Sequence, residues 1–419
     1  MVPKGWEDYT LSEITKWSSG GTPSKSSKEY WNGDIPWISA SSMRGHYYSD
    51  SDLKITELAV SEKAKMADKD NILLLVRGSM LWNKIPVGIT TRRVAFNQDV
   101  KCISPILSKL DIDFLLYWFL AKENQLMGMV TGTGIGAGKL DTNDLQSLNV
   151  LLPPLPEQQK IAKILSTWDK AISITERLIE NSTQQKKALM QQLLTGKKRL
   201  LDESGKRFEG EWEVVKLQSV LDLMRSGLSR KLENDNVGIA VIRSNNMGLK
   251  YTNNVDLKYW YLDDPQGANV SNYILDDGDL LVNFINSLSQ IGKACIYRKN
   301  LDVDAIYTTN ILRIKPNTEK VDPIYLYLLT KTANYDSYIT SITKPAVNQA
   351  SFTTKEFGNL EFNLPPLKEQ QKIATVLTNA DKEIELLEQQ LADLQQEKKA
   401  LMQVLLTGKK RVVVDGEIA

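Results

Sequence analysis

A segment of 48 residues occurs twice in this chain of 419 residues. The first copy is Leu152–Arg199, and the second, 212 residues later, is Leu364–Arg411. Aligned without a gap, the two copies are identical at 29 of the 48 positions, mostly within the end motifs LPPL-x-EQQKIA and KKALMQ-x-LLTGKKR. An internal repeat constrains a fold more than any local motif does, and two copies indicate a duplicated module rather than a solenoid.

Each copy predicts one long helix. The Pro-Pro pair suits the approach to a helix and its first turn. Glu157 and Glu369 fall in that first turn, where the helix dipole favours negative charge. Gly196 and Gly408 can adopt the left-handed conformation that ends a helix. Between these signals, apolar residues recur in alternating steps of four and three, which predicts a coiled coil.

The predicted seam favours an antiparallel pairing of the two copies. Its positions are Ile161, Leu165, Trp168, Ile172, Thr175, Ile179, Ser182, Lys186, Leu189 and Leu193 in the first copy, and Ile373, Leu377, Ala380, Ile384, Leu387, Leu391, Leu394, Lys398, Leu401 and Leu405 in the second. The first copy is too polar to stand alone, so the second is its natural partner. A parallel pair in register would set Lys186 against Lys398 inside the seam, which is costly. An antiparallel pair separates these lysines.

The residues before each copy predict two similar globular domains. In residues 1–150, short apolar runs bounded by turns read as strands at Ile35–Ser39, Asn71–Val76, Val87–Thr90, Val94–Phe96 and Lys101–Ser104. A helix at Leu110–Asn124, a glycine-rich loop at Thr131–Lys139 and a strand at Leu148–Leu152 follow. Residues 207–363 repeat this order, with a helix at Pro323–Thr332 and a polar loop near Thr343–Ser351.

The predicted fold class is therefore α+β, with two similar globular domains at opposite ends of a long antiparallel two-helix coiled coil and a pseudo-twofold internal repeat. We expect the first domain at residues 1–152 and its coiled-coil helix at 153–200. The second domain is expected at 207–363, and its helix at 365–411.

Composition excludes several classes of protein. The longest apolar run, Phe114–Ala121, is far shorter than the ~20 residues needed to cross a bilayer, so no membrane partner is expected. No secretion signal is recognisable, and two cysteines, Cys102 and Cys295, suit a reducing cytoplasm. The chain carries 52 basic and 51 acidic residues. Nucleic-acid binders usually show a basic excess, so tight DNA binding would need local patches or the charge of a partner.

No catalytic set emerges from the sequence. The single histidine, His46, lies in a polar loop without a spacing that suggests a triad or metal site. It is either a solvated loop residue, which we expect, or a DNA contact. No Asn/Asp-Pro-Pro-aromatic motif of an adenine methyltransferase is present. The loop Thr131–Lys139 fails the Walker and dinucleotide patterns, which leaves a mobile connector or a loop whose backbone approaches a phosphate. Glu397-Lys398-Lys399 fits part of a nuclease motif but lies on the predicted helix.

These features together resemble the specificity subunit of type I restriction–modification enzymes over essentially the whole chain. The resemblance rests on the helix starts at Leu152–Ala162 and Leu364–Ala374, on the two TGKKR helix ends and on the differing domain before each helix.

The resemblance implies a non-catalytic subunit that binds double-stranded DNA. Its two target recognition domains would each read half of an asymmetric, interrupted sequence, with the helices fixing the gap. Two copies of a modification methyltransferase subunit would dock on the repeats and supply S-adenosylmethionine-dependent adenine-N6 methylation. Restriction and translocase subunits, if present, would bring ATP and Mg. No cofactor is expected in this chain itself.

Base contacts call for Arg, Lys, Asn or Gln on elements that reach the major groove. We select as candidate DNA-binding residues Lys25, Ser41, Ser42, Arg44, Arg77, Asn83, Lys84 and Lys139 in the first domain, and Arg230, Arg243, Asn245, Asn246, Asn286, Ser287, Lys344, Asn348 and Gln349 in the second. For any single one, a solvated surface position is the alternative. Trp31, Trp37 and Trp82 could stack on bases, but the core is the more common place for tryptophan.

The repeated helix starts offer candidate docking residues for two copies of one partner. These residues are Glu157, Gln158, Gln159 and Lys160 in the first copy, and Glu369, Gln370, Gln371 and Lys372 in the second. Simple helix initiation is the alternative role for them. At the level of the whole chain, the alternative function is a coiled-coil scaffold whose two domains bind protein, which the near-neutral charge permits.

Overall fold

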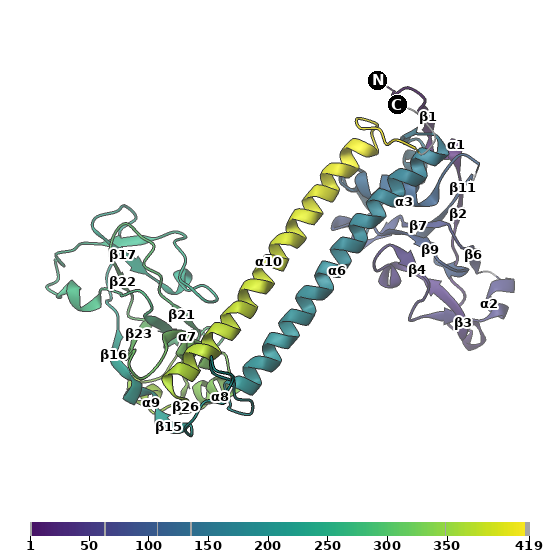
Figure 1. Ribbon diagram of the computed structural model, residues 1–419. Coiled ribbons are helices and arrows are strands. Elements are labelled where there is room, and N and C mark those ends of the chain that lie inside the picture. The colour runs from purple at the N-terminus through teal and green to yellow at the C-terminus, as the bar shows by residue number, and fades with distance from the viewer. Residues whose placement is uncertain (1, 63, 107, 135, 348, 415–419) are drawn as a thin grey trace. The chain divides into compact units, whose positions relative to one another are not determined.

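The computed structural model describes residues 2–62, 64–106, 108–134, 136–347 and 349–414. The chain forms two compact units (Figure 1). Unit 1 combines Met1–Arg177 with Glu388–Ala419, and unit 2 is Leu178–Leu387. Each unit holds one mixed sheet-and-helix domain and a part of both repeated segments.

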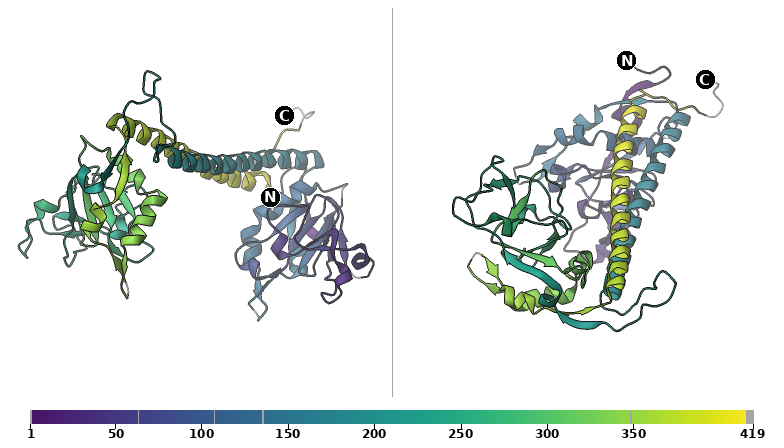
Figure 2. Two further views of the ribbon diagram at one scale, coloured as in Figure 1. Left: turned by 90° about the horizontal axis from the view of Figure 1, so that it is seen from below. Right: turned by 60° about the vertical axis from the view of Figure 1, so that its left-hand side comes forward.

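The repeated segments form two long helices, as predicted. α6 is Leu155–Leu193 and α10 is Leu367–Leu405, each of 39 residues. They run side by side in every view (Figures 1 and 2). Every predicted seam position is buried or half-buried. Just beyond the helix ends, Gly196 and Gly408 have φ of 72° and 66°, the left-handed conformation that suits glycine best.

Each unit shows by itself that the two helices are antiparallel. In unit 1 the first part of α6 shares a core with the last part of α10, through Ile161 and Leu165 on one side and Met402 and Leu405 on the other. In unit 2 the end of α6, at Leu193, shares a core with the start of α10. The predicted fold class is thus confirmed, because the antiparallel pairing and the two similar domains are both present.

The seam lysines explain why the antiparallel direction is favoured. Lys398 forms an ion pair with Asp169 in unit 1, and Lys186 forms the equivalent pair with Asp381 in unit 2. Asp381 also forms an ion pair with Lys250, whose Nζ lies 3.2 Å from the Asp381 Oδ2. Because Asp169 and Asp381 occupy the same place in the two copies, the repeat places an acidic partner opposite each seam lysine.

Replacing Asp381 by Ala is expected to destabilise unit 2. It would leave Lys186 and Lys250, whose side chains are 25% and 16% exposed, as two neighbouring cations without their shared acid. We expect a loss of about 2 kcal/mol in the free energy of unfolding, less than for a fully buried pair. Urea denaturation measures it. The control is Asp393→Ala on the exposed face of α10; equal midpoints for the two variants would contradict the role of Asp381.

The strands described in unit 1 all precede α6 in the sequence. They are β1 (Glu7–Thr10), β2 (Thr15–Ser19), β3 (Trp31–Ile38), β4 (Tyr47–Tyr48), β5 (Lys54–Ile55), β6 (Lys65–Ala67), β7 (Ile72–Leu75), β8 (Arg77–Gly78), β9 (Val87–Thr90), β10 (Val94–Phe96), β11 (Val100–Pro105), β12 (Thr131–Gly132), β13 (Gly138–Lys139) and β14 (Asn149–Leu152). The helices are α1 (Leu11–Ile14), α2 (Glu57–Glu62), α3 (Ile112–Ala121), α4 (Glu123–Gly128) and α5 (Thr142–Gln146).

The strands of unit 1 form four sheets. The two larger ones have the orders β2-β11-β7-β9-β4 and β5-β3-β10-β6, and the small ones are β12-β13-β8 and β1-β14. Helix α3 buries Phe114, Leu115, Trp118 and Phe119 in the main core, which also takes in the start of α6. The domain and the paired helices of unit 1 therefore share one continuous core.

Unit 2 repeats this plan with its own residues. Its strands are β15 (Glu213–Lys216), β16 (Leu221–Ser226), β17 (Ile239–Ile242), β18 (Lys258–Trp260), β19 (Leu280–Asn283), β20 (Ile285–Asn286), β21 (Ala294–Ile296), β22 (Ala305–Tyr307), β23 (Ile311–Pro316), β24 (Lys344–Pro345), β25 (Ala350–Ser351) and β26 (Glu361–Leu364). Its helices are α7 (Pro323–Leu329), α8 (Ala333–Ile342) and α9 (Thr354–Gly358).

The two units match sheet by sheet. The order β16-β23-β19-β21 corresponds to β2-β11-β7-β9, and β20-β25-β24 corresponds to β8-β13-β12. The parallel pair β17–β22 corresponds to the parallel pair β3–β10. The similarity that the sequence predicts between the two domains is therefore confirmed at the level of topology.

Two local predictions are corrected by the structure. The segment Thr131–Lys139 is not a plain connector, because its ends pair as β12 and β13. The predicted helix Leu110–Asn124 divides into α3 and α4 at Lys122. In both places a few backbone hydrogen bonds decide the outcome, which residue type alone does not reveal.

Candidate nucleic-acid interface

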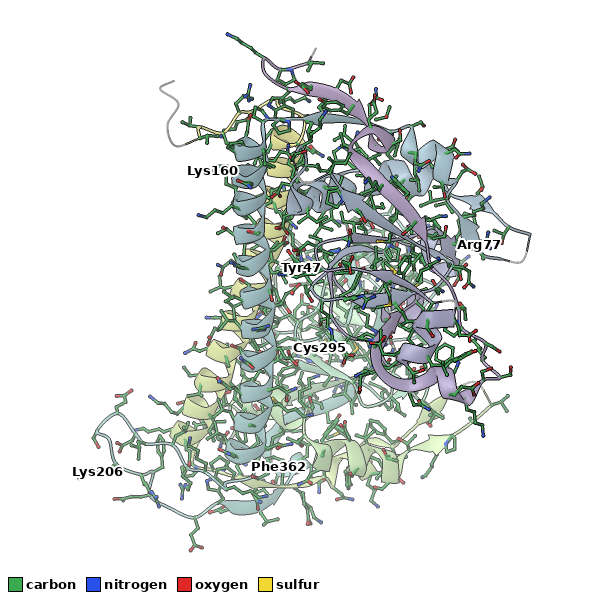
Figure 3. All side chains as sticks on the ribbon, turned by 90° about the vertical axis from the view of Figure 1, so that its right-hand side faces the viewer. Tyr47, Arg77, Lys160, Lys206, Cys295 and Phe362 are labelled. Carbon is green, nitrogen blue, oxygen red and sulfur yellow. The ribbon has the colours of Figure 1, made fainter. Side chains whose placement is uncertain are left out.

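A cationic hairpin stands out in unit 1. Strand β13 pairs with β8, so that Lys139 lies directly opposite Arg77. Side chains directly opposite each other in an antiparallel pair point to the same face. Arg77 is exposed and Lys139 is half-exposed. In Figure 3, Arg77 lies on the side of unit 1 away from α6. Two of the predicted DNA-binding residues are therefore brought together on one face.

The segment after β8 carries further predicted residues. A short 3₁₀ helix, η3 (Ser79–Trp82), leads to the exposed side chains of Asn83 and Lys84. Trp82 is 47% exposed, so the expectation of a core position is wrong for this tryptophan. Trp37, by contrast, is 5% exposed and belongs to a core. Of the two roles considered for Trp82, its exposure leaves base stacking open.

The remaining predicted residues of unit 1 lie in other loops. Lys25, Ser41 and Arg44 are exposed. Ser42 is half-buried and serves the local turn, since its hydroxyl donates to the carbonyl oxygen of Ser39 and accepts from the Ser39 N–H. His46 is exposed, as expected.

Unit 2 presents an equivalent hairpin with different side chains. Strand β25 lies between β20 and β24, with Ala350 opposite both Asn286 and Pro345. The predicted residues Ser287, Lys344 and Gln349 are exposed here. Asn348 lies outside the described residues. The two hairpins share their place in the fold and differ in the groups they offer.

Hydrogen bonds join a second predicted loop to the hairpin of unit 2. Ser244 donates to Asn283 at 2.8 Å, and Asn286 donates to Ser244 at 3.2 Å. Asn245, the next residue, is exposed. The turn Ser244–Asn246 and strand β20 therefore belong to one hydrogen-bonded surface.

Three of the predicted DNA-binding residues in unit 2 have partners within the fold. Arg230 forms a fork with Asp264, whose side chain is fully buried, and this contact holds the pKa of Asp264 well below its usual range. Arg243 pairs with Asp256 at 2.9 Å. The Asn246 side chain is buried and bonds only to backbone atoms. These groups therefore already have partners within the chain, and the assignment of base contacts to them stays a prediction.

Lys344 remains exposed although it has an acidic neighbour. Its ammonium group lies 2.8 Å from Glu356. Hydrogen bonds from Lys344 and Thr353 lower the pKa of Glu356 to about 2. Exposed pairs of this kind contribute little to stability, so Lys344 can exchange this carboxylate for a phosphate oxygen at small cost.

The acidic residue of each helix start lies in a buried clasp. In unit 2, Glu369 is fully buried and accepts two hydrogen bonds from Arg199, at 3.0 and 2.6 Å, and a third from the indole N–H of Trp212 at 3.1 Å. In unit 1, Glu157 accepts the same three bonds from Arg411 and Trp6. The repeated Arg at the end of each TGKKR motif thus fixes the start of the other helix.

The neighbouring glutamines fix the helix starts to the domains. The Gln158 side chain donates to the carbonyl oxygens of Lys109 and Pro153 and accepts from the Asp111 N–H. Gln370 makes the same three bonds to the backbone of unit 2, at Lys320, Pro365 and Asp322. Both glutamines are fully buried.

Half of the predicted docking residues are therefore unavailable to a partner. Glu157, Gln158, Glu369 and Gln370 are buried and bonded within the chain. Gln159, Gln371 and Lys372 are exposed, and Lys160 is half-buried on α6 (Figure 3). No sequence signal separated the two groups, because the identity of the repeat covers structural and exposed positions alike.

The described residues show neither a metal site nor an exposed thiol. They contain no group of His, Cys, Asp and Glu that could hold a metal ion. Both cysteines are buried and free, and burial raises the pKa of Cys295 to about 12, which keeps its thiol protonated and unreactive. No helix among the described residues is long and apolar enough to span a membrane.

Known proteins with similar sequences are specificity subunits. Residues 3–182 and 209–396 match the family described as "Type I restriction modification DNA specificity domain". The MjaVIII specificity subunit of Methanocaldococcus jannaschii is 28% identical over 98% of this chain and 94% of that protein. The EcoKI specificity subunit of Escherichia coli K12 is 24% identical over 89% of this chain and 81% of that protein.

Solved structures of such subunits share the fold. The specificity subunit from M. genitalium has a TM-score of 0.54 at 15% identity and covers 96% of both chains. The HsdS subunit from Thermoanaerobacter tengcongensis has a TM-score of 0.53 at 17% identity and covers 98% of both chains. These structures confirm the architecture that the repeat predicts.

The fold and the family match thus describe a non-catalytic DNA-recognition subunit. The chain belongs to the family of type I restriction–modification DNA specificity subunits. The resemblance drawn from the repeat is therefore confirmed. Neither the family nor the relatives favour the alternative of a scaffold whose domains bind protein.

Proposed function

We propose that units 1 and 2 each read one half of a gapped, two-part sequence in double-stranded DNA. The readers are the three-stranded hairpin sheets β8-β13-β12 and β20-β25-β24 with the loops beside them. The observation that carries this proposal is the matching position of the two sheets combined with their different exposed side chains. A shared scaffold with different readers suits a target whose two halves differ. A two-stranded β-ribbon is also narrow enough to enter the major groove.

The charge of the chain fits a division of labour with partner subunits. With a net charge of +1, the chain lacks the overall basic excess that nucleic-acid binders usually show. We therefore propose that it acts in a complex with two copies of a modification methyltransferase. Those subunits would supply further cationic surface, S-adenosylmethionine and adenine-N6 methylation. Restriction and translocase subunits, which would use ATP and Mg, can join the same core, and the complex would act in the cytoplasm.

The repeated helix starts are the proposed docking positions for the methyltransferase copies. Gln159 and Lys160 in α6 correspond to Gln371 and Lys372 in α10. They follow directly after the buried Glu157 and Glu369, whose hydrogen bonds fix the first turn of each helix. Two identical surface motifs, one in each unit, suit two copies of one protein.

The first test removes one amide reader from each unit. Asn83→Ala changes an exposed amide beside the hairpin of unit 1, and Gln349→Ala changes one at the hairpin of unit 2. Neither variant alters charge, so each should relax base choice at one position without a general loss of binding. A good bidentate amide contact discriminates against the wrong base by about ten- to hundredfold. Mapping methylated adenines in cells that carry the complex measures the change.

The two variants serve as controls for each other. We expect Asn83→Ala to broaden one half of the methylated sequence and Gln349→Ala to broaden the other half. If both variants altered the same half, or if both left the methylated sequence unchanged, the assignment of one reader to each unit would be wrong.

A further inference from the structure

In each unit a large apolar side chain is exposed in the segment that follows the strand flanking the reader hairpin. Trp82 follows β8 in unit 1, and Leu288 follows β20 in unit 2. Trp82 is 47% exposed and Leu288 is 69% exposed. Both β8 and β20 pair with the inner strand of a reader hairpin. Single exposed apolar residues are common on proteins. Here, however, each lies shortly after the strand that flanks a reader hairpin, four residues beyond Gly78 in unit 1 and two residues beyond Asn286 in unit 2.

Trp82 is held in a fixed orientation by the hairpin. Its indole N–H donates to the carbonyl oxygen of Gly136 at 3.0 Å. A Cβ atom at Gly132 would lie 4.0 Å from the indole ring, so the ring packs beside the hairpin backbone. The polar edge of the indole is satisfied within the protein, and about half of the side chain stays open to solvent. Such a ring loses little conformational freedom when it binds.

The surroundings of Trp82 are suited to a polyanion with an apolar interior. Arg77, Asn83 and Lys84 are exposed next to it in sequence, and Lys139 faces Arg77 across the strand pair. Double-stranded DNA has this combination, because phosphates line its outside and stacked bases fill its interior. Proteins that bend DNA insert apolar side chains between base steps while cationic groups hold the backbone.

We propose that Trp82 and Leu288 are wedges that open one base step in each half of the DNA target. This inference rests on the proposed function, in which the hairpin faces contact DNA. Each wedge would favour steps that unstack easily, such as pyrimidine–purine steps, and so contribute to specificity without hydrogen bonds to base edges. Opening the stack also serves a partner enzyme that must extrude a base before modifying it.

The wedge has a signature that a phosphate contact lacks. Stacking of an aromatic side chain on a base changes affinity by about ten- to hundredfold on substitution. Because no counterion release is involved, the salt dependence of binding should not change. Loss of a phosphate contact instead makes the fall of log K with log salt less steep, by about one unit of slope. The two kinds of contact can therefore be told apart in a single titration series.

The experiment uses the full chain in complex with its methyltransferase partner. The probe is a duplex that carries the sequence methylated in cells, with 2-aminopurine placed in turn at each position of both halves. Fluorescence of 2-aminopurine rises when its neighbours unstack. With the unaltered chain we expect one step in each half to brighten on binding. Trp82→Ala should abolish the signal in one half only, and Leu288→Ala in the other half only.

Matched controls separate the wedge from general loss of apolar surface. Leu58→Ala in α2 changes a side chain that is 49% exposed, and Val214→Ala in β15 changes one that is 68% exposed. Neither lies in a reader hairpin, so both should retain full affinity and both signals. Trp82→Phe removes the bond to Gly136 but keeps a ring, and it should retain most of the signal.

The outcomes distinguish this inference from the proposed function. If Trp82→Ala and Leu288→Ala bind like the unaltered chain and keep both signals, the wedge is overturned. Should Arg77→Ala in the same series reduce affinity and the salt slope, the hairpin remains a DNA contact and only the wedge fails. If neither Arg77→Ala nor Trp82→Ala changes binding, the proposed interface itself is wrong and the wedge falls with it.

Discussion

Replacing Arg199 by Ala is expected to destabilise unit 2 strongly. Arg199 supplies two of the three hydrogen bonds that the fully buried Glu369 carboxylate accepts. Without it, that carboxylate keeps only the indole N–H of Trp212. Removing one partner of a buried ion pair costs about 3 to 5 kcal/mol, because the remaining charge is left uncompensated. Urea denaturation of the purified chain measures the loss.

Two further variants make this prediction specific. Lys198→Ala removes an exposed neighbouring cation and should leave the midpoint unchanged. Adding Glu369→Gln to Arg199→Ala removes the uncompensated charge and should recover part of the lost stability. Unfolding of Arg199→Ala at the same urea concentration as Lys198→Ala would show that the clasp contributes nothing. Arg411→Ala should have the equivalent effect in unit 1 through Glu157, reduced by the greater exposure of Arg411.

Reversing the charges of Arg77 and Lys139 together is expected to have the largest effect on DNA binding. The two side chains lie opposite each other on the hairpin of unit 1. Two glutamates there would replace attraction to phosphates by repulsion. We expect at least about a hundredfold loss of affinity at physiological salt. The fall of log K with log salt should also become less steep, by about two units of slope. Filter binding or gel shift of the reconstituted complex across salt concentrations measures both quantities.

A matched control reverses one arginine and one lysine elsewhere in unit 1. Lys69 and Arg93 are exposed, and Lys69 precedes β7 whereas Arg77 follows it. Their reversal to glutamate changes the net charge by the same amount, so it should cause only a small, non-specific loss. Equal losses in the two double variants would mean that overall charge matters, and that the hairpin has no special part in binding.

The long helices and their direction could be predicted because the repeat made them visible. The apolar period located the seam, and Lys186 and Lys398 excluded the parallel pairing. What the sequence did not reveal was the acidic partner of each seam lysine. Asp169 and Asp381 directly follow the seam positions Trp168 and Ala380, so they fall outside the apolar pattern. Only the pairing of the two helices brings them next to the lysines.

The candidate site was predicted less completely than the fold. Residue type selected Arg77 and Lys139 as well as Arg230 and Arg243, but only the structure shows that Arg230 and Arg243 pair with Asp264 and Asp256 and are the less exposed cations. The acidic partners Asp264 and Asp256 lie in distant loops, so no local pattern announces them. Trp82 was assigned to the core because most tryptophans lie there, whereas the glycines of the neighbouring hairpin leave its ring supported but open.

The glutamine joints have a consequence for how such a chain can change over time. Gln158 and Gln370 grip their domains through main-chain atoms alone, at Lys109 and Asp111 in one unit and at Lys320 and Asp322 in the other. A joint that touches only the backbone is indifferent to the side chains of the part it holds. Recombination could therefore replace a whole reading domain with an unrelated sequence of the same backbone shape. The new domain would bring a new specificity while its connection to the helices stayed the same.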